Sequence, residues 1–270
     1  VNVLLQIREM CFVTKLDLRR SLRAPDWYDL TAQALREMPA LRALDLRRCN
    51  LGFTDSFVIP EAMRELTSLT WLRMSSNHLG DERMMKYVEA LKEMKSLTTL
   101  DCGDNFIQPL GAEKLAEALT EMKSLSVLDL DYNRLGDEGG PKIAHAVKGL
   151  TSLTHLDLRG NWIEQEGGLG IAEPLREMTS LTALRFGYNQ IGDEAAGRMA
   201  EAAKELPFLT SLDLCGADMH LDGLQDVLTA ALGMRLENFT LEGNSFEALD
   251  GMDMASLSMQ IDAERLLDQC

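Results

Sequence analysis

The segments LSVLDLDYNRL (residues 125–135) and LTHLDLRGNWI (residues 153–163) are two copies of one pattern, L-x-x-L-x-L-x-x-N-x-L/I. Further copies recur along the chain, 28 residues apart seven times and 27 residues apart once. The nine copies begin at Val13, Leu41, Leu69, Leu97, Leu125, Leu153, Leu181, Leu209 and Leu236. Because a fixed period of this length is the signature of a repeat architecture, this pattern decides the fold.

Each repeat changes its apolar period half-way. In the first half, apolar residues lie two apart, as Leu44 and Leu46 do, which is the period of a strand with one buried face. In the second half they lie three to four apart, as Leu115, Leu119 and Met122 do, which indicates one buried helical face. Neither element buries its apolar face alone, so neighbouring repeats must stack. We therefore predict an α/β solenoid shaped as a horseshoe arc, with parallel strands on the concave face and helices on the convex face.

An asparagine occupies the ninth position of six repeats, where the chain leaves the strand. These residues are Asn77, Asn105, Asn133, Asn161, Asn189 and Asn244. We expect their side chains to bond backbone groups that the turn leaves unpaired. Ser21, Cys49 and Ala217 occupy the same position, so we expect less regular turns in repeats one, two and eight.

A longer alternation of 56 residues is superimposed on the repeat. The motifs Leu79-Gly80-Asp81-Glu82, Leu135-Gly136-Asp137-Glu138 and Ile191-Gly192-Asp193-Glu194 recur in alternate repeats. Acidic residues at this place favour a helix N-terminus, so we interpret them as caps of the helices that they begin.

These features resemble the leucine-rich repeats of the ribonuclease-inhibitor type, which have long repeats with a full helix. The resemblance extends over nearly the whole chain and implies the horseshoe fold. Relatives of this shape include ribonuclease inhibitor, the Ran GTPase-activating protein and sensor regions of intracellular immune receptors, and most of them hold another protein. No functional residue of those relatives matches this sequence position by position.

We expect three parts in the chain. Residues 1–12 resemble the helix of a truncated preceding repeat, residues 13–249 form nine leucine-rich repeats of about 28 residues, and residues 250–270 form a C-terminal capping helix. The cut repeat leaves Val1, Val3, Leu4 and Leu5 without a neighbour. We therefore expect the N-terminal edge to be covered by upstream chain or by another subunit.

Composition excludes several classes of function. The 270 residues carry a formal charge of −16, and binding to nucleic acid backbones depends on clustered Lys and Arg, so we predict no nucleic-acid partner. No apolar run approaches the roughly 18 residues of a membrane span. Five scattered cysteines without a C-x-x-C pair favour free thiols and an intracellular, cytoplasmic location.

The sequence lacks several common enzymatic motifs. The sequence has no phosphate-binding glycine loop, no H-E-x-x-H motif and no dinucleotide-binding spacing, so we predict a non-enzymatic protein with no cofactor and no metal. The four histidines lie in separate repeats, and His155 is the one expected to point from a strand into the concavity. Met38, Met94, Met122, Met178 and Met234 share one phase of the helical half and are expected in the core.

The concave face is the expected binding surface. When the fourth and sixth positions point into the core, the third, fifth and seventh point outward, with the eighth just beyond. These positions carry a basic end, an acidic middle and a mixed aromatic end. The candidate partner-binding residues are Arg19, Arg20, Arg47, Arg48, Trp71, Arg73, Asp101, Asp104, Asp129, Asp131, Tyr132, His155, Arg159, Arg185 and Tyr188.

Alternatives remain open for this surface. Neighbouring Asp and Arg side chains could neutralise one another across strands, and Phe106 and Trp162 could extend the contact surface or pack under the loops. The partner could instead sit on the acidic outer helices, which carry Glu89, Glu93, Glu117 and Glu121. The function we predict is a protein-interaction module or scaffold subunit in a larger assembly. A GTPase-activating regulator of the Ran type and the sensor region of a larger intracellular receptor are the alternatives.

Overall fold

The computed structural model describes residues 10–22, 25–54 and 56–245, and these residues form a succession of strands and helices along a solenoid. The nine strands are β1 (Lys15–Asp17), β2 (Ala43–Asp45), β3 (Trp71–Arg73), β4 (Thr99–Asp101), β5 (Val127–Asp129), β6 (His155–Asp157), β7 (Ala183–Arg185), β8 (Ser211–Asp213) and β9 (Asn238–Thr240). The helices are α2 (Pro25–Arg36), α3 (Val58–Met63), α4 (Gly80–Leu91), α5 (Pro109–Leu119), α6 (Gly136–Val147), α7 (Gln165–Leu175), α8 (Gly192–Lys204) and α9 (Leu221–Ala231). Two short 3-10 helices, η1 (Met10–Phe12) and η2 (Leu51–Phe53), lie near the N-terminal end.

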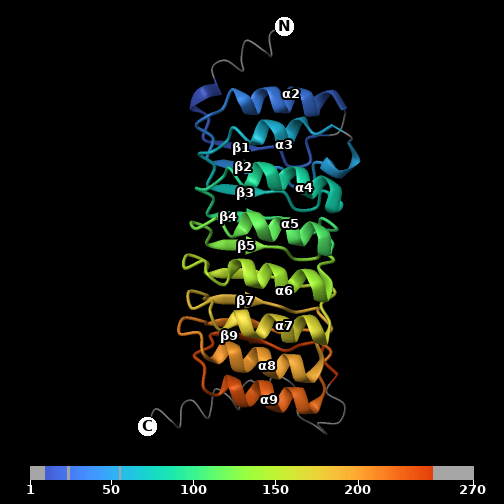
Figure 1. Cartoon of the computed structure of the whole chain (residues 1–270), viewed down its shortest axis with the longest axis vertical. Helices are drawn as coiled ribbons and strands as arrows, with labels where there is room; N and C mark the ends of the chain where they lie inside the picture. The colour runs from blue at the N-terminus through green and yellow to red at the C-terminus, as the bar shows by residue number, and fades with distance from the viewer. Residues whose placement is uncertain (1–9, 23–24, 55, 246–270) are drawn as a thin grey trace.

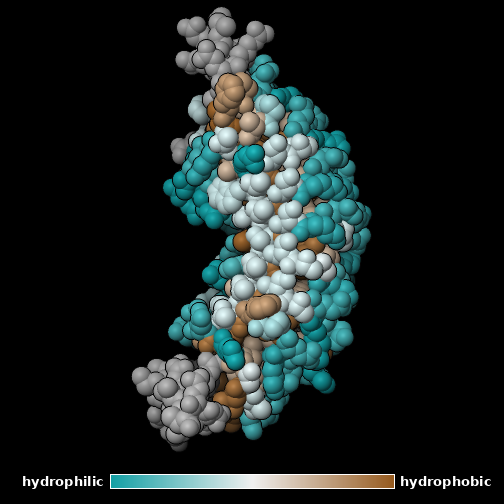
Figure 2. Space-filling model, turned by 90° about the vertical axis from the view of Figure 1, so that its left-hand side faces the viewer, coloured by the Kyte–Doolittle hydropathy of each residue, from teal (hydrophilic) through white to brown (hydrophobic). Residues whose placement is uncertain are grey.

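The strands form one parallel sheet in sequence order, and each repeat pairs with the next at the same repeat position. Leu44 pairs with Leu72, for example, and Leu72 with Leu100. The helices stack in a second layer along the sheet (Figure 1). Figure 2 shows a crescent whose convex side is covered by hydrophilic side chains. The predicted α/β solenoid is confirmed.

The core is the space between the sheet and the helices. The leucines at repeat positions four and six fill it, with Leu44, Leu72, Leu100 and Leu128 all fully buried. The methionines of the helical half are buried too, as predicted, with 0 to 7% of Met38, Met94, Met122, Met178 and Met234 exposed. Every helix in the described part of the chain is too short or too polar to span a bilayer.

The asparagines form a ladder beneath the turns. Asn133 accepts hydrogen bonds through Oδ1 from the backbone N–H groups of Asn105 and Ile107, and its Nδ2 donates to the carbonyls of Cys102 and Leu130. Because each amide bonds to the repeat before it as well as to its own, the ladder ties neighbouring repeats together.

Cys49 continues the ladder in repeat two. Its thiol donates to the Leu18 carbonyl at 2.9 Å, and its own N–H donates to Asn77 Oδ1. The sheet therefore keeps its register through this repeat, whereas the segment after it is irregular, with η2 and a six-residue α3 in place of a longer helix. Ala217 is fully buried and offers no side-chain acceptor, yet α9 in the same repeat is regular.

The turns themselves keep one conformation: Arg48 and Asn50 have φ 56° and 58°, and Gly216 and Asp218 have φ 54° and 59°, close to Gly160 and Trp162 at 61° and 57°. The predicted irregular turn is therefore wrong for repeats two and eight, and what is irregular in repeat two is the segment after the turn. The turn of repeat one leads into residues 23–24, which lie outside the described part of the chain, so that prediction is untested.

The 56-residue alternation arises from bonds between repeats. Asp81, Asp137 and Asp193 lie in the first turns of α4, α6 and α8, but these helices have no side-chain cap. Each Oδ1 instead accepts the N–H of the residue that precedes the next helix. The donors are Gln108, Glu164 and His220, at 2.7, 2.7 and 2.6 Å. The prediction that these aspartates cap their own helices is wrong, because the helices pack closely enough for each carboxylate to reach its neighbour.

Glycines make room for these bonds. A Cβ on Gly167 would lie 2.8 Å from Asp137 Cα, which is too close for any side chain. Gly223 stands in the same relation to Asp193, and a Cβ on Gly111 would collide with the Asp81 carboxylate. Glycine and aspartate therefore act as a pair that joins repeats two by two.

Parts of the predicted organisation lie outside the described residues. The helix expected over residues 1–12 is described only from Met10, where the chain forms η1, and the capping helix expected over 250–270 is not covered. The covered N-terminal edge therefore remains a prediction.

Candidate functional site

Aspartate and arginine pairs within single repeats organise the concave surface. Repeat position five ends the strand and position seven follows two residues later on the same side, so Asp45 lies beside Arg47. The Asp45 carboxylate accepts the Arg47 backbone N–H at 3.1 Å and its guanidinium Nη2 at 2.7 Å. Asp17 with Arg19, and Asp157 with Arg159, repeat this geometry. The bond from Asp157 raises the pKa of Arg159.

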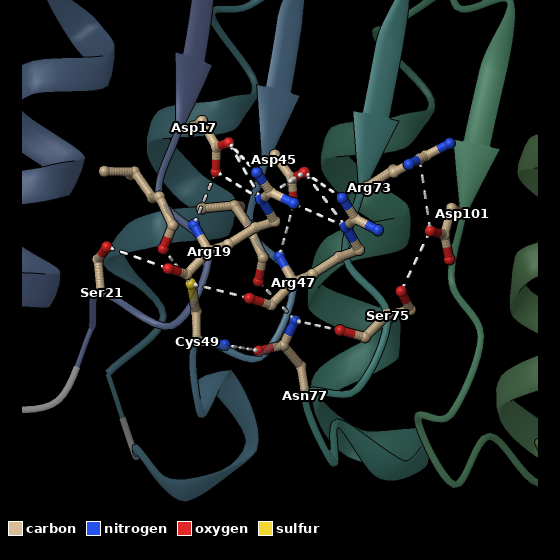
Figure 3. A network of polar contacts seen from close by, with 12 residues as sticks. Asp17, Arg19, Ser21, Asp45, Arg47, Cys49, Arg73, Ser75, Asn77 and Asp101 are labelled. Atoms are coloured by element: carbon tan, nitrogen blue, oxygen red, sulfur yellow. Dashed lines mark hydrogen bonds and ion pairs between the residues drawn. The ribbon is translucent and has the colours of Figure 1, made fainter.

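Further pairs cross from strand to strand at the N-terminal end (Figure 3). Arg19 Nε lies 3.5 Å from Asp45 Oδ2, and Arg73 Nε lies 3.7 Å from Asp101 Oδ2. Trp71 is partly buried, with the Arg73 guanidinium 4.6 Å from its ring centre. Lateral neutralisation therefore accounts for much of the basic cluster, and Trp71 is less free to contact a partner than its sequence position suggests.

A basic hollow remains at this end. It is lined by Asp17, Arg19, Arg20, Arg47, Arg48, Ser75 and Ser76 and encloses about 650 Å³. Four arginines line it against two carboxylates, Asp17 in the lining and Asp45 paired with Arg47, so the hollow carries net positive charge, and Arg48 is exposed.

An acidic hollow adjoins the basic one and shares Ser75 and Ser76 with it. It encloses about 480 Å³ and is lined by Ser75, Ser76, Asp101, Asp104, Asp129, Asp131 and Tyr132. Repeats four and five place Gly103 and Asp131 at position seven, where three other repeats have the paired arginine. A Cβ on Gly103 would collide with Asp131 Oδ1, so the glycine lets this carboxylate lean across the neighbouring strand.

Ionisation of the carboxyl groups in the acidic hollow is unfavourable. Burial and the neighbouring Asp131 carboxylate raise the pKa of Asp129 to about 7, and burial together with Asp157 raises the pKa of Asp131 to about 6. A cation at this place relieves the repulsion between the carboxylates. Arg159 partly does so, with Nη2 3.7 Å from Asp131 Oδ2.

Three carboxylates of this region lie close enough to share a metal ion. Oxygens of Asp129, Asp131 and Asp157 lie within 4.8 Å of one another. The Asp157 carboxylate already binds Arg159 at 2.7 Å and has Arg185 at 3.5 Å. Two of the three carboxylates, Asp131 and Asp157, thus already have guanidinium partners that neutralise them.

Two tyrosines lie at repeat position eight, Tyr132 in the lining of the acidic hollow and Tyr188 two repeats further along the chain. A Cβ on Gly160 would lie 2.8 Å from Tyr132 Cδ1, and one on Gly216 would lie 3.1 Å from Tyr188 Cδ1, so each ring lies across the glycine of the next repeat. Tyr132 remains 51% exposed and Tyr188 57% exposed. Each ring therefore has one face fixed against backbone and the other available to a partner.

Comparison with known proteins identifies the repeat. Residues 121–144, 149–172 and 177–200 match the family model described as Leucine Rich repeat. The chain contains leucine-rich repeats. No curated protein sequence matches the chain significantly.

Solved leucine-rich repeat structures share the fold. Internalin C2 of Listeria monocytogenes is 22% identical with a TM-score of 0.59, and the alignment covers 87% of this chain and 83% of internalin C2. Internalin InlF of the same organism is 19% identical with a TM-score of 0.53, covering 83% and 61%. The leucine-rich repeat ectodomain of the Arabidopsis receptor kinase HAESA, solved with a peptide hormone ligand, is 20% identical with a TM-score of 0.52, covering 80% and 32%. At these identities the likeness concerns the fold alone.

The candidate partner-binding residues lie in three groups along one face of the leucine-rich repeats. Arg19, Arg20, Arg47 and Arg48 line the basic hollow, whereas Asp101, Asp104, Asp129, Asp131 and Tyr132 line the acidic one. Asp101 is only 9% exposed, so it contributes charge more than contact. Arg73 lies between the hollows, whereas His155, Arg159, Arg185 and Tyr188 follow on β6, β7 and the turns after them.

Sequence reasoning missed Ser75 and Ser76, which form the floor common to both hollows. They occupy repeat positions seven and eight, the same positions that supplied the charged candidates. Position alone was therefore the signal that pointed to them.

Proposed function

We propose that this chain is a non-enzymatic protein-binding module that holds a protein partner in its concavity. The observation that carries the proposal is the continuous face on which a basic hollow, an acidic hollow and two half-exposed tyrosines follow one another. Charges of both signs in fixed order set the register of a partner, and Tyr is a residue type that dominates interface energies.

The outer helices suit this role less well. Three of the four glutamates named for this surface have lysine partners: Lys92 lies 3.1 Å from Glu89 and 3.6 Å from Glu117, and Lys95 lies 3.3 Å from Glu121. Such exposed pairs contribute little energy and keep the surface hydrated. The HAESA ectodomain, with the same fold, was solved with a peptide ligand, which supports a binding role for a leucine-rich repeat of this shape.

Two features of the chain support a finer classification. Helices of 11 to 13 residues occur in α4 to α9, which supports the ribonuclease-inhibitor type. Cys11, Cys49, Cys102 and Cys215 are free thiols, which supports an intracellular location. We place the protein as a subunit or scaffold in a larger assembly.

The test uses a partner captured from the source cells by the immobilised chain and then purified. Tyr132→Ala removes a ring from the lining of the acidic hollow, and Glu93→Ala removes an exposed carboxylate from the helical side that has no ion pair in the described structure. We expect Tyr132→Ala to weaken binding by about 2 kcal/mol, or roughly 30-fold in Kd, and Glu93→Ala to change it less than about twofold.

Charge reversal supplies a second readout. Arg48→Glu places a negative charge in the basic hollow and is expected to slow association with the partner and to alter its salt dependence, with a smaller effect on dissociation. Loss of binding in Glu93→Ala, with Tyr132→Ala and Arg48→Glu unchanged, would place the partner on the helices and reject the proposal.

A further inference from the structure

A continuous stack of rings and one guanidinium runs along the turns, beside the concave face but outside both hollows. We call Phe53, His78, Phe106, Arg134 and Trp162 the ring stack. His78 lies 5.2 Å from Phe53 and 5.0 Å from Phe106, measured between ring centres. The Arg134 guanidinium lies 4.6 Å from the Phe106 ring centre and 4.9 Å from the Trp162 ring centre. The last four members share the tenth position of successive repeats, so the repeat itself generates the stack.

The stack is exposed. Trp162 is 64% exposed, Phe53 73% and Phe106 36%, so these side chains do not pack under the loops. Aromatic rings in contact with one another stay ordered while their outer edges face water. Trp and Arg in such a setting are the residue types most enriched among interface hot spots.

Arg134 is held without an acidic partner. Both faces of its guanidinium lie against rings, and among the described residues it has no ion pair and donates no side-chain hydrogen bond. The in-plane N–H groups therefore point away from both rings. A guanidinium fixed in this way is a preorganised fork for a carboxylate, because little conformational freedom is lost when two parallel hydrogen bonds form.

The rings are not required by the turn that carries them. Phe106 has φ 59° and Trp162 has φ 57°, both in the left-handed region that bulky residues rarely adopt. Asn50 and Asp218 hold the same position with φ 58° and 59°, and Asn and Asp tolerate that conformation better. Large rings are thus present at a conformational cost, where a smaller residue would suit the backbone.

We propose that the ring stack is a second binding surface, which takes an acidic segment of a partner protein. A carboxylate of that segment forms a bidentate pair with Arg134, and an adjacent apolar or aromatic side chain lies on Trp162. A basic segment is disfavoured here, since Arg134 has no carboxylate beside it to accept a cation. None of the five stack residues lines either hollow, so the stack is a surface distinct from the hollows of the concave face.

The experiment uses displayed random peptides as the probe. A phage library of 12-residue peptides is first depleted on the intact chain carrying both Arg134→Lys and Trp162→Asn, and the remainder is selected on the wild-type chain. Synthetic copies of the enriched peptides are then titrated against single variants. Arg134→Lys keeps the charge but removes the planar fork, and Trp162→Asn removes the ring while suiting the backbone.

We expect enriched peptides that carry Asp or Glu next to an apolar or aromatic residue. Their Kd is expected to rise at least tenfold with Arg134→Lys and with Trp162→Asn. Gln190→Ala, at the tenth position of a repeat outside the stack, and Tyr132→Ala, in the concavity, are expected to change Kd less than twofold. The thermal midpoint of Trp162→Asn is expected to equal or exceed that of the parent, which separates a binding role from a structural one.

Four outcomes of the peptide selection would overturn the proposal. An empty selection, enriched peptides without a carboxylate, or peptides that bind Arg134→Lys as well as wild type would each overturn the proposal. Peptides that lose binding to Tyr132→Ala alone would overturn it as well while supporting the concave site.

Discussion

Replacement of Asn133 by alanine tests the energetic role of the asparagine ladder. Asn133 is 2% exposed, and its Oδ1 accepts the N–H groups of Asn105 and Ile107, both at 3.0 Å. Neither donor has another acceptor among the described contacts, so alanine leaves two buried N–H groups unpaired. The carbonyls that lose the Asn133 Nδ2 donor stay hydrogen-bonded. Cys102 O still accepts from Asn105 Nδ2, and Leu130 O still accepts from Asn161 Nδ2.

The expected loss of unfolding free energy comes from the two N–H groups left unpaired. An unpaired buried donor costs about 1–3 kcal/mol, and some relaxation of the turn is expected, so Asn133→Ala should lower the free energy of unfolding by about 2–4 kcal/mol. Asn161 provides a matched control. It is fully buried and its Nδ2 donates to Leu130 O, Leu158 O and Arg159 O, but its Oδ1 accepts no hydrogen bond. Asn161→Ala should therefore cost about 1 kcal/mol.

Urea unfolding followed by circular dichroism measures both variants against the parent. The slope with denaturant must be compared as well, because stacked repeats can lose cooperativity when one interface weakens. Equal losses for the two variants, or an Asn133→Ala midpoint equal to that of the parent, would refute the argument that the two N–H groups carry the energy.

Two further predictions concern the acidic side chains. Asp137→Ala removes the bond to the Glu164 N–H at the start of α7 and should cost about 1 kcal/mol in urea unfolding, whereas Glu138→Ala next to it should cost less than half as much. A native-like Asp137→Ala would show that this bond does not couple the repeats. Because the pKa of Asp129 is raised to about 7 in the folded chain, from 3.8, the stability linked to this group is present below pH 4 and is lost as pH rises through 7. Asp129→Asn should therefore be more stable than the parent by about 1–2 kcal/mol at pH 8, after allowance for solvent screening and for coupling to Asp131, and equal to it near pH 4. An unchanged difference in urea midpoint between the two pH values would show that Asp129 titrates normally.

The repeat period was enough to predict the strands, the core and the asparagine ladder. The spacing of 28 residues places Leu44, Leu72 and Leu100 in register, and it places the asparagines one above the other, so strands, core and ladder follow from it. The same period places positions five, seven and eight on one face. The composition of the two hollows was therefore readable before the structure, apart from Ser75 and Ser76.

The hydrogen-bond partners of the side chains could not be predicted from the repeat period. Whether Arg47 bonds Asp45 in its own repeat or an aspartate in the next one depends on rotamers and on the separation of strands, and the structure shows the former. Asp137 looked like the cap of its own helix, and only the packing of α6 against α7 shows that it bonds Glu164. The stack of Arg134 between Phe106 and Trp162 likewise needs the turn conformation, which places residues 28 apart in contact.

Hydrogen exchange of the chain alone and in its native complex shows which face of the solenoid the partner covers. Partner binding in the concavity predicts slower amide exchange for the strands β4 to β7 and for the turns that carry Tyr132 and Tyr188, with α4 to α8 unchanged. Protection confined to the outer helices, with the strands and these two turns exchanging as in the free chain, would contradict a concave binding site.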